Sequence, residues 1–163
     1  MRYSIAAIET KYRGVLFRSR LEAKWAAFFD ILKWKWQYEP CDLPKWSPDF
    51  FVCAKKRLRD GELRRIPFLA EIKPYSRCSQ FDDHVFMQYT TGHPLFKCEA
   101  CVGLGIDPSV SAIELESDGA GSFGPVPFSY LVSRDCSDRD LVKMWRKACN
   151  KVQWRFDSNG KRV

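Results

Sequence analysis

The chain has 163 residues, of which 45% are hydrophobic and 15% aromatic. This length and composition are typical of one folded domain with a packed core, and they exclude wholesale disorder. No apolar stretch reaches the length of a membrane span, and no basic-then-apolar signal segment opens the sequence. We therefore expect a soluble, cytoplasmic protein with no membrane partner.

The chain is basic, with 27 lysines and arginines against 20 acidic residues and a net charge of +7. An excess of this size favours a polyanionic partner through counterion release. It does not name the partner, and a solvated basic surface would have the same composition.

Seven cysteines form no regular framework, which indicates reduced thiols rather than disulfides. Cys98 and Cys101 have the spacing of a metal-binding pair. They fall on a strand-like segment, however, where residues three apart face opposite sides of a sheet. A structural metal at this pair is a minor alternative.

Hydrophobic periodicity predicts the elements in chain order. Ser19 and Glu22 have the spacing of a capping box, and the apolar residues that follow recur at helical intervals. Asp60-Gly61 lies between two strand-like runs and predicts a hairpin turn. The expected elements are a strand over 3–10, a helix from the Ser19 cap to Leu32, strands over 34–38, 48–53 and 66–72, a helix over 79–91, strands over 95–104, 112–115 and 127–132, and a helix after Ser137 that reaches about Val152.

These elements predict a single α/β domain, with a central mixed sheet flanked by helices and a C-terminal helix. Its core is expected over residues 13–105 and its C-terminal extension over 106–163. Three tryptophans, Trp25, Trp34 and Trp36, fall on apolar periodicities and are expected in the core.

Two short motifs carry the chemistry. Pro48-Asp49 opens a strand, and Glu71-Ile72-Lys73 ends an apolar run. Two carboxylates can hold a hard divalent cation, which neutralises charge on a phosphate and acidifies a bound water. Glu71 and Lys73 point to the same side of their strand because side chains alternate. The pattern is typical of metal-dependent phosphodiester hydrolysis.

Four runs in this order resemble the PD-(D/E)XK nuclease superfamily. Within it the chain looks most like small phage-type nucleases and the N-terminal domain of transposon-end endonucleases. The resemblance covers roughly residues 13–105 and has no counterpart in the C-terminal third. The runs are FRSRLEAKWA at 17–26, YEP at 38–40, PDF at 48–50 and AEIKP at 70–74.

The resemblance implies a restriction-endonuclease-like sheet and an endonuclease that cuts DNA with Mg²⁺ or Mn²⁺, leaving a 5′-phosphate. Asp49, Glu71 and the main-chain carbonyl of Ile72 would hold the cation, and Glu22 would bind it directly or through water. Lys73 would orient or help deprotonate the attacking water and stabilise charge in the transition state. The catalytic residues implied are Glu22, Asp49, Glu71 and Lys73.

Each of these residues also has a structural interpretation. Glu22 is equally suited to complete the Ser19 cap, Asp49 to cap a turn after Pro48, and Glu71 to form an ion pair with Lys73. Glu39, in the Tyr-Glu-Pro run, would either support the site or pair with Lys35.

Basic residues surround the predicted site and hairpin. They are suited to phosphate contacts that position DNA without reading its sequence, although any one of them is also consistent with a solvated surface. Those expected near the site are Arg13, Arg18, Arg20, Lys24 and Arg77, and those on the hairpin are Arg57, Arg59, Arg64 and Arg65.

The sequence thus predicts a metal-dependent DNA endonuclease whose partner is DNA and which is suited to act as a homodimer or in a larger nucleoprotein complex. The alternative is a catalytically idle nuclease fold that binds nucleic acid or protein as an accessory or inhibitor subunit. A zinc-stabilised adaptor built on Cys98 and Cys101 is a third hypothesis.

Overall fold

The computed structural model describes residues 7–58, 60–89, 100–115, 128–132 and 136–152. Its elements are β1 (Thr10–Tyr12), β2 (Val15–Phe17), α1 (Arg20–Ile31), β3 (Lys35–Tyr38), β4 (Phe50–Arg57), β5 (Leu63–Ile72), the 3-10 helices η1 (Cys78–Phe81) and η2 (Val85–Tyr89), β6 (Ala100–Leu104), β7 (Ser111–Leu115), α2 (Ser129–Val132) and α3 (Asp138–Lys151).

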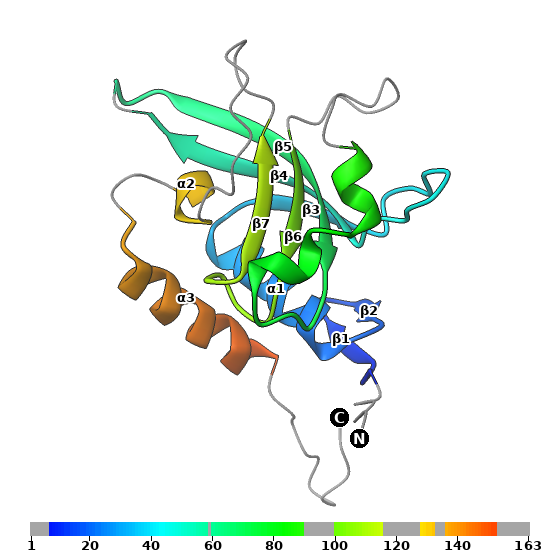
Figure 1. Cartoon of the computed structure of the whole chain (residues 1–163). Helices are drawn as coiled ribbons and strands as arrows, with labels where there is room; N and C mark the ends of the chain where they lie inside the picture. The colour runs from blue at the N-terminus through cyan, green and yellow to red at the C-terminus, as the bar shows by residue number, and fades with distance from the viewer. Residues whose placement is uncertain (1–6, 59, 90–99, 116–127, 133–135, 153–163) are drawn as a thin grey trace, which may run out of the picture.

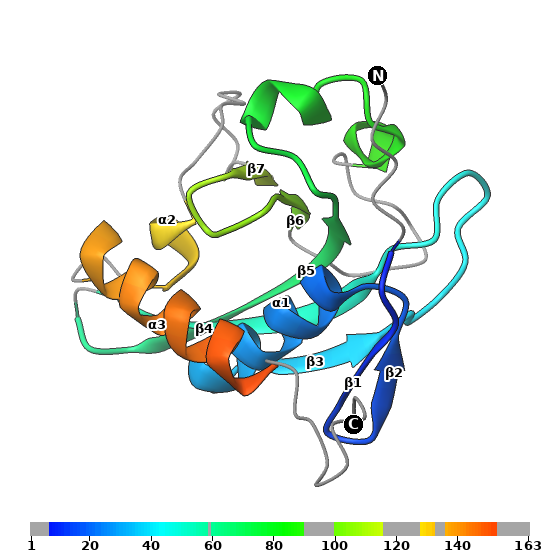
Figure 2. The ribbon, with the colours of Figure 1, turned by 90° about the horizontal axis from the view of Figure 1, so that it is seen from below.

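Five strands form one mixed sheet in the order β3-β4-β5-β6-β7, and β1 and β2 form a separate two-stranded sheet. Pairing is antiparallel throughout the large sheet except between β5 and β6, which run parallel. Figures 1 and 2 show α3 and the two 3-10 helices on opposite sides of the strands. The protein is therefore α/β, with a mixed sheet and a C-terminal helix, as expected.

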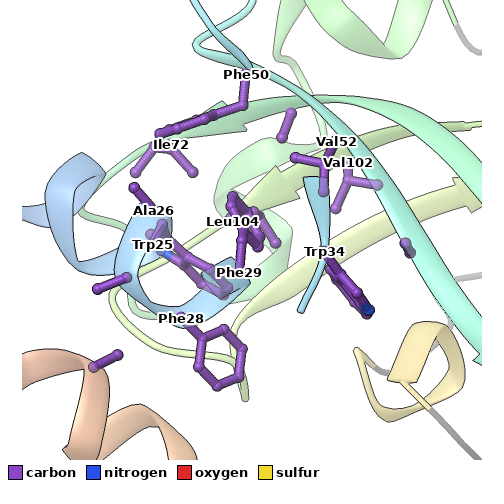
Figure 3. Close-up of a cluster of buried hydrophobic side chains, with 14 of the residues drawn as sticks. Trp25, Ala26, Phe28, Phe29, Trp34, Phe50, Val52, Ile72, Val102 and Leu104 are labelled. Carbon is purple, nitrogen blue, oxygen red and sulfur yellow. The ribbon is translucent and has the colours of Figure 1, made fainter. Parts of the chain in front are cut away.

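The main core lies between α1 and one face of the sheet, and it is rich in aromatic rings. Figure 3 shows Trp25 and Phe29 of α1 against Leu104, with Phe50 and Ile72 nearby. Burial alternates along β4, where Phe50, Val52 and Ala54 are fully buried. The predictions that Trp25 and Trp34 are buried and that Trp36 packs against the same core are confirmed.

A second, smaller cluster covers the opposite face of the sheet. Leu69 of β5 packs there with Trp46, Phe81 and Phe86. The odd-numbered residues of β5 therefore face a different layer from the even-numbered ones, because side chains alternate across a strand. Glu71 belongs to the odd-numbered set.

The two long helices follow the predicted caps. The Ser19 hydroxyl accepts a hydrogen bond from the Glu22 N–H at 3.2 Å, and α1 begins at the next residue after Ser19. Ser137 and Asp140 form a reciprocal capping box at the start of α3. The strands expected over 34–38, 48–53, 66–72 and 112–115 are also present, with shifted bounds.

The prediction of a helix over 79–91 is wrong for residues 79–89, the part that the structure describes. Two short 3-10 helices occupy this segment instead, and the Gln80 side chain accepts from the N–H groups of Ser76 and Arg77 ahead of the first. Phe81 and Phe86 are both fully buried in the second cluster. A continuous α-helix would point residues five apart about 140° away from each other, so the break lets both rings pack.

The strand predicted over 127–132 is also wrong, because Ser129–Val132 form the short helix α2. Phe128 and Leu131 are both buried in the main core. Residues three apart share a side in a helical turn and face opposite sides in a strand. The predictions that concern 3–6, Arg59 and 95–99 lie outside the described residues.

Two remaining features bear on the expectations from composition. Among the helices of the described segments, none is long and apolar enough to cross a bilayer. Cys101 is buried, with its thiol 3.7 Å from the Tyr89 carbonyl oxygen, and Cys98 lies outside the described residues.

Candidate functional site

Asp49 and Glu71 lie at the adjoining ends of two antiparallel strands. Phe50 of β4 is the register partner of Ala70 of β5, and both side chains point into the main core. Asp49 precedes Phe50 and Glu71 follows Ala70, so continuing the register places the two acids opposite each other. Their exposed fractions are only 3% and 5%. The hairpin therefore brings two buried carboxylates to one end of the sheet.

Asp49 is held by groups from two other segments. Its Oδ2 accepts a hydrogen bond from the Ile72 N–H at 2.7 Å, and its Oδ1 lies 2.5 Å from Nη2 of Arg18. Burial and the negative charges of Glu71 and Glu22 nevertheless raise the pKa of Asp49 from 3.8 to about 7. The charged form of Asp49 is therefore disfavoured by its burial and by the two neighbouring acids, as is typical of a carboxylate placed near others without a cation.

Glu71 has a different set of partners. The Lys73 ammonium lies 2.5 Å from Oε1, and the Trp46 indole N–H donates to Oε2 at 2.7 Å. His84 is also near, with Nε2 3.5 Å from Oε1. The predicted convergence of Glu71 and Lys73 on one side of the strand is present, with the ion-pair geometry of the structural interpretation.

The Lys73 amine is cationic at neutral pH. Burial lowers the pKa of Lys73, but the hydrogen bond and charge of Glu71 and the charge of Asp49 outweigh that effect and raise it. A protonated amine is suited to stabilise negative charge and to orient a water, and it is a poor proton acceptor.

Glu22 reaches the same region from the first turn of α1. It is 7% exposed, its Oε1 accepts from the Ser19 hydroxyl at 2.8 Å, and its Oε2 accepts from the Tyr38 hydroxyl at 2.5 Å. The Tyr38 oxygen in turn accepts from Nε of the Arg18 side chain at 3.3 Å, and Nη2 of Arg18 contacts Asp49. Glu22 and Asp49 are thus joined through two intervening side chains. Ser19 caps α1, but the Glu22 carboxylate accepts from the Ser19 hydroxyl rather than from its main-chain N–H, so the reciprocal bond of a capping box is not among its contacts.

The donor set suits a hard cation in its chemistry but not yet in its arrangement. Carboxylate oxygens and a main-chain carbonyl such as that of Ile72 are ligands that Mg²⁺ accepts. Each carboxylate is turned to its own partners, and within the described segments no group of three or more His, Cys, Asp or Glu side chains is arranged to hold a metal. Arg18 would have to leave Asp49 before a cation could bind there.

The predicted DNA-contact residues come from different parts of the fold. The Arg13 guanidinium pairs with Asp30 at 2.9 Å, on the turn of the small sheet. Arg18 lies at the carboxylates, whereas Arg77 is exposed and precedes η1. Arg20 and Lys24 follow on α1 and are both partly buried. Within this set, the Arg18 guanidinium contacts a predicted metal ligand, Asp49.

Glu39 does not pair with Lys35. Its Oε1 lies 3.1 Å from Nε of Arg18, and its main-chain N–H donates to the Asp49 carbonyl at 2.8 Å. Glu39 has a φ of 45°, a left-handed backbone conformation that is uncommon outside glycine. The residue helps hold Arg18 beside Asp49, which agrees with a supporting role.

Trp46, His84 and Arg18 are the site contacts whose roles sequence reasoning missed. Trp46 is 25 residues from Glu71 and Arg18 is 31 residues from Asp49. No local periodicity or motif spacing marks such pairs. A tryptophan isolated in a proline-rich loop was the one available signal, since a buried indole N–H needs an acceptor.

Comparison with protein-family models, curated proteins and solved structures found no match to this chain.

Proposed function

We propose that this protein is a metal-dependent DNA endonuclease. The observation that supports it most directly is the pair of buried carboxylates, Asp49 and Glu71, with the Lys73 ammonium 2.5 Å from Glu71. Buried acids that repel each other are costly, and such groups cluster at functional sites. An excess of positive charge over the whole chain suits a polyanionic substrate.

The order of elements supports the same proposal. A helix that bears Glu22 is followed by β3, by the β4–β5 hairpin and by β6, which runs parallel to β5. Asp49 stands at the start of the second of these strands and Glu71 near the end of the third. These are the positions implied by a resemblance to the PD-(D/E)XK superfamily and its restriction-endonuclease-like sheet.

In the proposed reaction a water oxygen bonds to phosphorus and the bond to the 3′ oxygen breaks. The departing oxygen takes up a proton, which leaves a 5′-phosphate and a 3′-hydroxyl. Asp49, Glu71 and the Ile72 carbonyl would hold Mg²⁺ or Mn²⁺, with Glu22 beside them. The cation would supply charge neutralisation and acidify a water. Lys73 would donate hydrogen bonds to the water and to the phosphate, where its positive charge offsets the charge of the transition state.

Arg18 is suited to exchange partners during binding. Its side chain is 59% exposed, although its Nη2 contacts the buried Asp49. A guanidinium forms strong bidentate hydrogen bonds with phosphate. We propose that Arg18 moves from Asp49 to a DNA phosphate when the cation binds. The Asp49 carboxylate then has a positive partner in both states: Arg18 before the cation binds, and the cation afterwards.

The test is a cleavage assay with Mg²⁺ or Mn²⁺ on supercoiled, linear and branched DNA. We expect wild-type protein to cut at least one substrate, and Asp49→Ala and Lys73→Ala to lose cleavage by at least about 100-fold while still binding DNA. A wild-type protein that leaves all three substrates intact with both metals would contradict the enzymatic proposal.

A second candidate is a nuclease fold that binds nucleic acid or protein without cutting. It is favoured by the partners that already engage every carboxylate: Arg18 on Asp49, Lys73 and Trp46 on Glu71, and Ser19 on Glu22. Calorimetric titration separates the candidates. Mg²⁺ or Mn²⁺ binding that disappears in Asp49→Ala supports the enzyme, and DNA binding without any metal binding supports the idle module.

A further inference from the structure

Within the described segments, the β4–β5 hairpin extends beyond the strands that pair with it in the large sheet. β3 pairs with β4 only as far as Cys53, and β6 pairs with β5 only from Phe68 onward. Residues 54–57 and 63–66 therefore pair with each other but have no strand neighbour on either side among the described residues. Figure 1 shows this two-stranded segment, which we call the arm, projecting past β3 and β6.

One face of the arm carries exposed positive charge. Lys55, Arg57 and Arg65 are exposed and lie on the face opposite the main core, because Ala54 and Ile66 are buried on the other face. Within the described part of the chain, none of these three cations takes part in an ion pair. Leu63, the cross-strand partner of Arg57, is an apolar side chain that is 60% exposed.

The register places two of these cations directly opposite each other. Lys55 is the cross-strand partner of Arg65. Like charges in directly opposed positions destabilise an antiparallel pair. The hairpin is not stabilised by such a pair, whereas a bound polyanion would neutralise both charges at once.

The cationic face of the arm is also the face that carries Glu71. Odd-numbered positions of β4 and β5 share this side of the sheet, and Asp49 and Glu71 stand at its other end. At about 3.3 Å per residue, Lys55 lies roughly 20 Å and Arg57 roughly 26 Å along the strand from Asp49. These separations correspond to about six to eight base pairs of duplex DNA at 3.4 Å per pair.

We propose that the arm is a β-ribbon that binds duplex DNA about six to eight base pairs from the phosphate at the carboxylate site. A two-stranded ribbon fits the major groove of B-form DNA, and Lys55, Arg57 and Arg65 contact its phosphates. This inference takes DNA as the partner from the proposed function. It adds a second contact region, remote from the chemistry, that extends the footprint of the protein along one side of the cut.

Binding without cleavage tests the arm. Fluorescence anisotropy in EDTA measures the affinity for a labelled duplex of roughly 24 base pairs, long enough to reach both regions, over a series of salt concentrations. The variant Lys55→Gln/Arg65→Gln should bind more weakly, and its slope of log affinity against log salt should be shallower by about 2, because each phosphate contact contributes about 0.9. Arg57→Gln alone should lower the slope by about 1.

The matched control removes the same charge elsewhere. Lys143→Gln/Lys147→Gln alters two exposed cations of α3 and should leave the slope within about 0.5 of wild type. An arm variant that keeps the wild-type slope, or a control that loses as much as the arm variant, would overturn the inference. Thermal melting checks folding, and relief of the Lys55 and Arg65 repulsion should leave the arm variant at least as stable as wild type.

The two proposals fail in different ways. If wild-type protein cuts DNA and the arm variant keeps the wild-type slope, the proposal for the arm is contradicted and the proposed nuclease activity stands. If wild-type protein cuts no DNA and the arm variant has a shallower slope, the proposed nuclease activity is contradicted. The arm is then a contact region of a DNA-binding module.

Discussion

The guanidinium of Arg18 lies 2.5 Å from the carboxylate of Asp49, although the two residues are 31 positions apart and Asp49 is almost fully buried. Arg18 also contacts Glu39, whose main chain donates to the Asp49 carbonyl. The Arg18 guanidinium can therefore occupy the position in which a divalent cation would otherwise neutralise the charge of Asp49.

Arg18→Gln should therefore make the protein more dependent on metal. Without metal, the loss of the counter-charge should lower the free energy of unfolding by about 1 to 2 kcal/mol, less than for a fully buried pair because Arg18 is more than half exposed. Thermal melting with and without Mg²⁺ measures the effect, and the shift on adding metal should be larger than in wild type.

Arg13→Gln is the control for that experiment, since it removes an equal charge that pairs with Asp30. Its melting temperature should respond to Mg²⁺ as the wild type does. Equal metal responses in the two variants would contradict the idea that Arg18 occupies a cation position.

The raised pKa of Asp49 predicts a loss of stability with rising pH in the absence of metal. Between its ordinary value of 3.8 and its folded value of about 7, the folded protein holds a proton that the unfolded chain has released. The free energy of unfolding should thus fall as pH rises through this range, by up to about 4 kcal/mol from this group. Urea unfolding in EDTA at several pH values measures the change.

Asp49→Asn removes the titrating group and keeps its approximate shape. The fall in stability between pH 4 and 8 should be smaller in this variant than in wild type, by about the contribution of Asp49. Parallel pH profiles for the two proteins would show that other groups cause the dependence.

Trp46→Phe should weaken the support of Glu71. The Trp46 indole N–H donates to Oε2 of the buried Glu71 at 2.7 Å, and phenylalanine leaves that oxygen without this donor. We expect a loss of about 1 to 3 kcal/mol in urea unfolding. Trp36→Phe is the comparison. The Trp36 indole N–H donates to Asp30, which keeps hydrogen bonds from Tyr12 and Arg13 when Trp36 is replaced. A larger loss in Trp36→Phe would argue against a special role for Trp46.

Gly103→Ala should displace the segment that covers the second cluster. A Cβ at Gly103 would lie 2.6 Å from Cδ1 of Phe81, a fully buried ring of η1. Overpacking of this kind costs about 1 to 3 kcal/mol. The check is a double-mutant cycle in urea with Phe81→Leu, in which the pair should lose less stability than the sum of the single variants. Additive losses would mean that the two residues do not clash.

The predictable parts of this fold are those with a local signal. The helices after Ser19 and Ser137 have caps and a 3.6-residue apolar period, and the hairpin around Gly61 has a turn sequence with strands on both sides. The contact between Glu71 and Lys73 was likewise predictable, because alternation along one strand decides it.

Segments whose local signal was ambiguous were predicted wrongly. Residues 79–91 have apolar positions compatible with a helix, but Phe81 and Phe86 both pack on the face of the sheet that carries Leu69. Because both rings pack against this distant face of the sheet, the segment forms two short 3-10 helices instead of one α-helix. Phe128 and Leu131 are similar, since packing on the core selected a helical turn over a strand.

The sequence by itself determined the α/β class, the two capped helices, the hairpin and the side of β5 on which Glu71 and Lys73 meet, because each follows from residues within a few positions of one another. Only the tertiary structure decided that Arg18 lies on Asp49, that Trp46 and His84 lie on Glu71, and that Tyr38 connects Glu22 to Arg18. Those contacts join segments brought together by burial of the core, and the electrostatics of the carboxylates depend on them.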